Sequence, residues 1–391
     1  MPVTILNYGI LTVAAIPLIY YLLAMWSTLR FFLQSRKDLL PSGDFTPPIS
    51  CLKPIKGLDI EAYENYASFC RQDYPDYEIL FCVDSDDPAF PLLEKLIREF
   101  PKSKIRLLFG SGRTAINDKV ARLVRLTAEA KHDIFVITDG DVRVGPEYLR
   151  TVVSPLRDPH VGAATCLYVS TKDTNLVEEL QSIGMISDFF ASTMVAWNLD
   201  GIKFTFGQTI VTRRESVQGY GGYTVIENRP ADDVYAGRLV AEQGYEVKLL
   251  PYVVQSVADF HSFKDLLHKR IRWMTVQRLM RPWGHVGLIF TFGLPWALLA
   301  VAIHPTMWTA LAYLGGYALC RIMMTWLVGV WGMKQHGIWK KVPLIPVWDA
   351  IAFLLWIASF ARRTIRWRGV DYFIREGMLV PAAPAHPQGS D

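Results

Sequence analysis

Apolar residues are distributed unevenly along this chain of 391 residues. Residues 3–29 include no Asp, Glu, Lys or Arg, and residues 286–332 include only Arg321. A helix needs about 20 mostly apolar residues to cross a bilayer. The first stretch is long enough for one such helix, and the second is long enough for two. The pattern therefore predicts membrane spans at about residues 5–29, 286–303 and 307–332.

A third apolar block, residues 342–361, is interrupted by Asp349 and has basic residues on both sides. Because basic residues favour the cytosolic side of a membrane, both ends of this block are expected in the cytosol. A re-entrant or interfacial segment fits these charges better than a true span. A charge inside a membrane is costly unless it is paired, so Arg321 and Asp349 are expected to face each other.

Charge placement also orients the other apolar blocks. Arg30, Arg36 and Lys37 follow the first block, which lacks a basic segment before it and is too long for a signal peptide. We therefore interpret it as a retained anchor with its C-terminal end in the cytosol. The localisation expected is a bacterial inner membrane or a Golgi or ER membrane. The second apolar block is preceded by five basic residues, Lys269, Arg270, Arg272, Arg278 and Arg281.

Between the membrane blocks, short apolar runs alternate with longer stretches of helical pattern. Such alternation indicates an α/β domain with a mostly parallel sheet flanked by helices. Strands are expected at residues 49–52, 78–83, 105–109 and 134–138, and helices at residues 61–71, 88–100 and 119–130.

Four parts follow from these patterns. We expect an anchor and linker at residues 1–46, a cytosolic globular domain at 47–262, an interfacial amphipathic helix at 263–284, and a membrane region with a basic tail at 285–391. Within the globular domain, residues 183–199 are apolar and aromatic, which suits either a lid over an acceptor groove or a core helix packed on the sheet.

Composition narrows the class of partner. The mean hydropathy of +0.19 is high for a soluble protein, and the net charge of +4 is too small to indicate nucleic acid binding. The basic clusters border the membrane blocks, where anionic lipid headgroups account for them. The five cysteines lack the spacing of metal ligands, and no protein partner is indicated.

Two of the expected strands end in acidic residues. Asp84 follows the strand at 78–83, and Asp139-Gly140-Asp141 follows the strand at 134–138. Ligands of open α/β sheets bind beyond the carboxyl ends of the strands, and carboxylates there suit a divalent cation bound to phosphates. An aspartate after a strand can also cap a helix or form a turn, and for Asp84 alone that alternative is equally good. The chain has no Gly-rich phosphate loop, so acids and a metal would have to hold a diphosphate.

Asp232-Asp233 opens a further helix, and Lys269-Arg270-Ile271-Arg272-Trp273 follows before the membrane. The order D, DxD, (E/D)D and then (Q/R)xxRW resembles membrane-bound inverting glycosyltransferases of the GT-A fold, and most of all the ceramide glucosyltransferase family. The resemblance extends over residues 48–369. It is carried by Leu52-Lys53-Pro54-Ile55-Lys56-Gly57, Asp84, Asp86-Asp87-Pro88, Asn117-Asp118-Lys119-Val120, Asp139, Asp233, Arg272-Trp273 and Thr364-Ile365-Arg366-Trp367-Arg368-Gly369.

This resemblance implies inverting transfer of a hexose, glucose from UDP-glucose, to the hydroxyl of a membrane lipid such as ceramide. The base would be Asp233, assisted by Arg272 at the leaving group and by Trp273 against the acceptor or sugar. The remaining expected site residues are Asp139 and Asp141 as ligands of Mg²⁺ or Mn²⁺, Asp84 at the nucleoside, and Lys53, Pro54 and Lys119 in the nucleotide pocket, with Asp139 also contacting the donor.

Two departures from the family pattern leave other acceptors open. Lys269 replaces the Gln or Arg that opens the RW motif. The second acid of the DxD motif is present as Asp141, which brings the chain closer to the bacterial hopanoid-lipid transferases. An alternative is therefore transfer to a hopanoid or another lipid, for example from UDP-N-acetylglucosamine. A processive glucan synthase would need more spans, and a non-catalytic membrane scaffold would not need every acid. Taken alone, a basic and aromatic cluster beside a membrane is usually an interface anchor.

Overall fold

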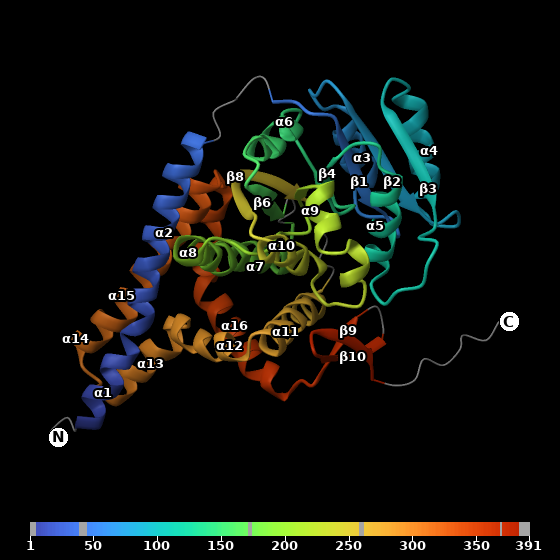
Figure 1. Cartoon of the computed structure of the whole chain (residues 1–391). Helices are drawn as coiled ribbons and strands as arrows, with labels where there is room; N and C mark the ends of the chain where they lie inside the picture. Colours follow the sequence, from blue (N-terminus) through green and yellow to red (C-terminus); the bar gives the residue numbers. More distant parts are fainter. Residues whose placement is uncertain (1–4, 39–44, 171–173, 258–261, 368–369, 383–391) are drawn as a thin grey trace. The chain divides into compact units, whose positions relative to one another are not determined.

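The computed structural model describes residues 5–38, 45–170, 174–257, 262–367 and 370–382 (Figure 1). Contacts between Cα atoms divide the chain into two compact units. We call them the membrane unit (Met1–Arg30, Thr174–Val195 and Phe260–Asp391) and the sheet unit (Phe31–Asp173 and Ala196–Asp259). The expected globular domain at 47–262 thus differs from this grouping, which assigns Thr174–Val195 to the membrane unit. Part of the expected linker, residues 39–44, lies outside the described residues.

The sheet unit is built on a sheet of eight strands with the order β3-β2-β1-β4-β7-β6-β8-β5. Its strands are β1 (Ile49–Pro54), β2 (Tyr77–Val83), β3 (Lys104–Phe109), β4 (Ile134–Ile137), β5 (Val142–Arg143), β6 (Val161–Ser170), β7 (Ile210–Arg213) and β8 (Glu246–Ser256). Its helices are α3 (Ala62–Cys70), α4 (Phe90–Glu99), α5 (Asp118–Glu129), α6 (Tyr148–Val153), α9 (Arg214–Gly219) and α10 (Asp232–Glu242), with 3₁₀ turns η1 (Ser154–Arg157) and η3 (Tyr223–Ile226).

The strands β3, β2, β1 and β4 are parallel, as the alternating pattern predicts, and α3, α4 and α5 connect them (Figure 1). All residues of β1 and β4 are buried. Burial on both faces explains why β4 is a continuous apolar run, whereas β1 also buries the polar residues Ser50 and Lys53. The strand β7 is antiparallel to both its neighbours, β4 and β6. The α/β class is therefore confirmed, with a sheet that is mixed beyond β4.

The membrane unit is mainly helical. It contains α1 (Ile5–Ala14), most of α2 (Ile16–Asp38), α7 (Leu176–Gly184), η2 (Met185–Phe190), the start of α8 (Ala191–Asp200), α11 (Phe263–Met280), α12 (Pro282–Gly287), η4 (Leu288–Thr291), α13 (Gly293–Ile303), α14 (Met307–Ala310), η5 (Leu311–Gly315), α15 (Gly316–Thr325), η6 (Trp326–Gly332), η7 (His336–Leu344) and α16 (Ile345–Ala361). A small antiparallel sheet of β9 (Thr364–Trp367), β10 (Val370–Arg375) and β11 (Met378–Pro381) follows.

Within the described residues, three helices are long and apolar enough to cross a membrane: Ile5–Ser35, Met307–Gly332 and His336–Ala361. A fourth candidate is a pair, Pro282–Thr291 and Gly293–Ile303, bent by 55°. The bend falls where Gly293 and Pro295 follow each other closely, and proline and glycine are common causes of sharp kinks. The apolar stretch at 286–303 is thus helical but broken, and the block at 342–361 lies in a helix that is long enough to span.

The helix α16 runs alongside α11 within the membrane unit. The Arg270 guanidinium lies 4.6 Å from the ring centroid of Trp348, near the start of α16. Eight residues later, Arg278 lies 5.9 Å from the Phe360 ring and donates a hydrogen bond to the carbonyl oxygen of Arg362. The two helices are therefore roughly parallel over most of their length, and α16 shares the orientation of α11.

Arg321 and Asp349 form the ion pair that their depth in apolar stretches predicts. The Arg321 Nε lies 2.9 Å from Asp349 Oδ2, and its Nη2 bonds Asp349 Oδ1. The Tyr317 hydroxyl donates to the same carboxylate at 2.7 Å, and Ser187 accepts from Arg321. Arg321 is 4% and Asp349 6% exposed. Each charge is thus buried and fully engaged, which is the condition under which membrane proteins tolerate such groups.

The first part of the segment 183–199 packs around the Arg321–Asp349 ion pair of the membrane unit. A side-chain carbon at Gly184 would lie 2.3 Å from the Trp348 ring, so only glycine allows α7 and α16 to approach this closely. Ser187 contacts Arg321, and residues up to Val195 belong to the membrane unit. Residues 183–195 therefore pack within the membrane unit.

Replacing Arg321 by Leu would leave the Asp349 carboxylate buried without its cation. We expect the free energy of unfolding in detergent to fall by about 3–5 kcal/mol, because removing one partner of a buried pair is strongly destabilising. The matched control is Arg238→Leu, which breaks an exposed 2.7 Å pair with Glu242 and should change stability by less than about 1 kcal/mol. Equal stability of the two variants would contradict a structural role for the buried pair.

Candidate active site

The acidic residues singled out by the sequence follow parallel strands that end at one edge of the sheet. Asp84 comes directly after β2, and Asp139 comes two residues after β4. The register places Leu52 of β1 between Leu80 of β2 and Ile137 of β4. The carboxyl ends of these three strands therefore coincide, at the edge where α/β folds bind their ligands.

Lys119 links two of the acidic motifs. Its ammonium nitrogen lies 2.7 Å from Asp139 Oδ1 and 3.2 Å from Asp232 Oδ2. The Asn117 side chain caps the N-terminus of α5 and donates to Asp232 Oδ1 at 3.2 Å. Burial disfavours the charge on Lys119, but Asp139, Asp232 and Asp233 outweigh it and raise its pKa. Lys119 is therefore a fixed cation between the acids that follow β4 and those that open α10.

Asp233 is held by two backbone amides at the start of α10. Its Oδ2 accepts from the Gly207 N–H at 3.1 Å, and its Oδ1 accepts from the Val234 N–H at 2.9 Å. Burial, followed by the charge of Asp232, raises the pKa of Asp233 to about 6. The N-cap of α10 is Ala231 in a left-handed conformation, with a φ of 56°. Asp232 and Asp233 consequently lie inside the helix rather than capping it.

Gly207 allows these groups to approach each other. A side-chain carbon at Gly207 would lie 2.8 Å from Asp139 Oδ2 and 3.1 Å from Lys119 Nζ. Its own N–H binds Asp233. Gly207 thus contacts the acids of both motifs through its backbone alone, and any other residue would push Asp139 or Lys119 aside.

Asp84 forms an ion pair with Arg122 of α5, the helix that also contributes Lys119. Its Oδ2 lies 2.6 Å from Nη2 of Arg122, whose side chain is 1% exposed, whereas the Asp84 side chain is 41% exposed. Lys119 and Arg122 are three residues apart and lie on the same face of α5. Lys119 binds Asp139 and Asp232, whereas Arg122 binds Asp84. Asp84 remains open to solvent and available to a ligand.

Lys53 lies beneath the site. Its ammonium donates to Thr138 Oγ1 at 2.8 Å and to the Asp139 carbonyl oxygen at 3.2 Å, and it lies 3.7 Å from the Phe69 ring centroid. Burial lowers the pKa of Lys53 to about 8. Lys53 and the following Pro54 are both buried in β1. Their contacts support the turn after β4 from below.

Asp59 is a further carboxylate that the sequence reasoning missed. A side-chain carbon at Gly140 would lie 2.5 Å from Asp59 Oδ2, so the Asp59 carboxyl packs against the turn between Asp139 and Asp141. Burial, followed by the charges of Asp141 and Asp139, raises the pKa of Asp59 to about 6. Asp141 itself accepts from Ser256 Oγ at 2.6 Å. The available signal was position, because Asp59 lies two residues after the Lys53–Gly57 motif.

The donor atoms at this turn suit a hard divalent cation. Burial, partly offset by Lys119 and reinforced by Asp141, raises the pKa of Asp139. Carboxylates crowded in this way gain from a further positive charge, and oxygen ligands are those that Mg²⁺ and Mn²⁺ prefer. In the part of the chain that the structure describes, no three His, Cys, Asp or Glu side chains converge as a complete metal site. The chemistry of the acids therefore fits a cation, while a closed set of ligands is not formed.

Arg272 and Trp273 lie on α11 in the membrane unit. Arg272 lies 5.9 Å from the ring centroid of Trp367 in β9, so the RW motif contacts the segment that begins at Thr364. The Trp273 ring lies near Phe189, at 5.9 Å between centroids, and has Lys269 at 5.4 Å. Arg368 and Gly369, at the end of the motif Thr364-Ile365-Arg366-Trp367-Arg368-Gly369, lie outside the described residues.

Comparisons with known proteins identify the family of the chain. The family model described as glycosyl transferase family 21 matches residues 9–380. Ceramide glucosyltransferase 3 of Caenorhabditis elegans is 21% identical over 392 residues, which cover 95% of this chain and 82% of that protein. The ceramide glucosyltransferase of Gibberella zeae is 30% identical over 161 residues, which cover 38% of this chain and 29% of that protein.

A solved structure shares the fold. The mannosyltransferase PcManGT from Pyrobaculum calidifontis, in complex with GDP-Man and Mn²⁺, matches with a TM-score of 0.54 at 18% identity, over 86% of this chain and 99% of its own. At this identity the similarity supports the GT-A fold alone. Since the family model extends over nearly the whole chain and its helices include membrane-spanning candidates, the chain belongs to glycosyl transferase family 21 and is a membrane-bound hexosyltransferase of the GT-A fold.

Proposed function

We propose that the protein transfers glucose from UDP-glucose to the hydroxyl of ceramide, with inversion, to form a β-glucosyl lipid. The observation that carries this proposal is the set of acids joined by Lys119 at the carboxyl edge of the sheet. The ceramide glucosyltransferases similar to this chain support the lipid acceptor. The solved mannosyltransferase with GDP-Man and Mn²⁺ supports a nucleotide-sugar donor and a divalent cation.

Asp233 is the proposed base. The Gly207 and Val234 amides fix its carboxylate, which can then accept the proton of the acceptor hydroxyl as this oxygen attacks the anomeric carbon. A pKa of about 6 makes Asp233 a stronger base than an ordinary aspartate while it stays ionised at neutral pH. A single displacement inverts the anomeric centre, so an α-linked donor yields a β-linked product.

The leaving diphosphate needs positive charge. A divalent cation held by Asp139 and Asp141, with Asp59 beside them, would supply much of it when bound. Lys119 keeps Asp139 turned toward Asp232 and would add its own positive charge near the donor. We assign Arg272 to the same task and Trp273 to the acceptor or sugar, while Asp84 would contact the nucleoside.

We also propose that the sheet unit faces the cytosol and that the bent pair, rather than α16, completes the crossings. The Tyr21 hydroxyl donates to the Thr291 carbonyl at 3.0 Å and accepts from the Gly293 N–H at 2.8 Å, so the bend lies beside the middle of the anchor. The Tyr313 hydroxyl bonds the Leu11 carbonyl near the anchor's N-terminal end. The bent pair would therefore leave the cytosol, and Met307–Gly332 would return.

On this topology α16 does not cross the bilayer. It lies beside α11, with which it is parallel, and its Asp349 meets Arg321 of the span Met307–Gly332. Both of its basic flanks then face the cytosol, in agreement with the positive-inside rule. A helix of mixed basic and apolar character such as α11 is suited to the headgroup region. The arrangement resolves the conflict between the length of His336–Ala361 and the charges at its two ends.

A hopanoid acceptor remains an alternative, because the second acid of the DxD motif, Asp141, makes the chain similar to the hopanoid-lipid transferases. The purified enzyme should be incubated in turn with UDP-glucose, UDP-galactose and UDP-N-acetylglucosamine, each with ceramide, a hopanoid alcohol or diacylglycerol. We expect a hexosyl-ceramide from UDP-glucose, identified by mass spectrometry, with its β linkage established by NMR. Product only with the hopanoid, or polymeric glucan without lipid, would replace the proposal by the corresponding alternative.

Asp233→Asn should lower kcat by about 10²–10⁴-fold, because this is the usual contribution of a general base. The wild-type kcat should fall tenfold per pH unit below about pH 6, since protonation of Asp233 removes the base. Steady-state kinetics across pH would measure both effects.

The control for this variant is Asp76→Asn, which alters an exposed aspartate paired with Lys104 at 2.7 Å and should leave kcat and its pH profile unchanged. Full transferase activity of Asp233→Asn would overturn the assignment of the base.

The proposed topology can be tested by single-cysteine labelling with an impermeant maleimide. Cysteines placed at Lys340 and Arg366 should react only from the cytosolic side of membrane vesicles, and one placed at Thr306 only from the opposite side. The parent chain provides the background from its five native cysteines. Labelling of positions 340 and 366 from opposite sides would mean that α16 crosses the bilayer.

A further inference from the structure

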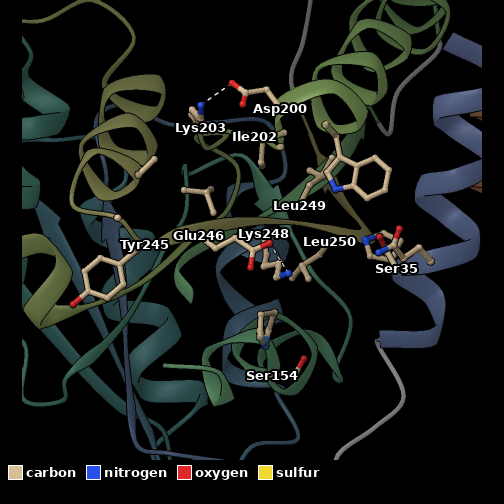
Figure 2. A pocket seen from close by; sticks show the side chains of 18 residues that line it. Ser35, Ser154, Asp200, Ile202, Lys203, Tyr245, Glu246, Lys248, Leu249 and Leu250 are labelled. Atoms are coloured by element: carbon tan, nitrogen blue, oxygen red, sulfur yellow. Dashed lines mark hydrogen bonds and ion pairs between the residues drawn. The ribbon is translucent and has the colours of Figure 1, made fainter. Parts of the chain in front are cut away.

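The sheet unit contains a hollow that lies far from the acids of the active site. It has a volume of about 500 Å³ and is bordered by the end of α2, the 3₁₀ turn η1, the loop after α8 and the first half of β8 (Figure 2). A volume of this size is within the range of sites for small ligands. No residue assigned above to the transferase reaction contributes to its wall.

The length of the strand β8 gives the separation between the hollow and the acids of the active site. Glu246 at its start lines the hollow, whereas Ser256 at its end donates to Asp141. A strand advances about 3.3 Å per residue, so ten residues place the two ends about 30 Å apart. The hollow is therefore distinct from the proposed transferase site.

The C-terminal end of the anchor helix lines the hollow. The candidate span Ile5–Ser35 has 31 residues, which corresponds to about 46 Å at 1.5 Å per residue. The hydrocarbon core is about 30 Å thick. The helix is thus about 16 Å longer than the core is thick, so part of it extends into the headgroup layers. Ser35 and Gln34, at the C-terminal end of this helix, line the hollow, which suits a ligand from the headgroup layer.

The floor of the hollow is apolar and its rim is charged. Ile202, Leu249 and Leu250 are each at most 5% exposed, and Trp197 packs edge-on against Phe31 of α2 at 5.1 Å. Tryptophan with one polar atom on an apolar ring is typical of the membrane interface. An amphiphile with an apolar part and a polar head matches this arrangement better than a wholly polar metabolite.

Two ion pairs stand on the rim. Lys203 lies 2.6 Å from Asp200, and Lys248 lies 2.6 Å from Glu246 (Figure 2). All four side chains are at least 42% exposed, and exposed pairs of this kind contribute little to stability. They can therefore exchange partners with a ligand at low cost. Their charges sum to zero, which favours a ligand that carries both signs over one with net negative charge.

We propose that this hollow binds the headgroup of a zwitterionic glycerophospholipid from the cytosolic leaflet. The lipid phosphate would bind Lys203 and Lys248, the headgroup amine would bind Asp200 and Glu246, and the glycerol and upper acyl chain would lie against Trp197 and the apolar floor. The site would fasten the sheet unit to the leaflet at the end of the anchor.

The test uses the full-length protein, purified in a neutral detergent and depleted of lipid. Short-chain phosphatidylethanolamine and phosphatidylglycerol would be titrated separately, with binding followed by native mass spectrometry and by the thermal unfolding midpoint. We expect saturable binding of phosphatidylethanolamine with an increase in the midpoint, and weaker binding of phosphatidylglycerol. The double reversal Lys203→Glu and Lys248→Glu should weaken binding about tenfold or more, since like charges would then face the phosphate.

The matched control is Lys95→Glu, which reverses an exposed, ion-paired lysine on α4, outside the hollow, and should bind like the wild type. If the double variant does not fold, Lys203→Gln alone should still weaken binding. The proposal is overturned if phosphatidylethanolamine does not bind saturably, if phosphatidylglycerol binds equally well, or if the hollow variants bind like the Lys95→Glu control.

Discussion

The active site depends on one constraint: several negatively charged side chains lie close together at one edge of the sheet. Asp59, Asp139, Asp141, Asp232 and Asp233 come from three separate segments, and their mutual repulsion would keep them apart without a cation. Lys119 supplies one within the chain, at 2.7 Å from Asp139 and 3.2 Å from Asp232. The pKa of Asp59 and that of Asp233 are nevertheless raised to about 6, by burial and by neighbouring carboxylates. A cluster with this unbalanced charge is suited to a metal ion, to a base, or to both.

The membrane unit handles charge differently. There Arg321 and Asp349 neutralise each other, with Tyr317 and Ser187 completing their hydrogen bonds. A fully satisfied buried pair specifies how α15, α16 and η2 fit together, because any other packing would leave a charge unpaired. The contrast separates two uses of buried ions in one chain. One arrangement is complete and structural, and the other is incomplete and open to a ligand.

Glycine sets how closely the backbone approaches these groups. At Gly207 a side chain would meet Asp139 and Lys119, at Gly140 it would meet Asp59, and at Gly184 it would meet Trp348. The first two positions bring backbone to the carboxylates that we assign to the reaction, and the third brings two helices together. These contacts explain why a site of bulky charged groups can be built from short loops after the strands.

Several features could be predicted from the sequence alone, because they depend on local pattern or on the depth of a charge. Apolar length identified the membrane blocks, alternation identified the four parallel strands, and two isolated charges in apolar stretches identified the Arg321–Asp349 pair.

Other features required the tertiary structure. Gly207 has no distinctive local pattern, and the only signal for Asp59 is its position two residues after the Lys53–Gly57 motif. Their contacts arise only when distant segments meet at the sheet edge. The Lys119 bridge joins residues more than 100 positions apart. The orientation of α16 beside α11 likewise follows from side-chain packing between helices, which hydropathy does not encode. Composition and spacing therefore determined that acids and a membrane surface would be present, and the fold decided which of them meet, because electrostatic contact depends on distance in space and not along the chain.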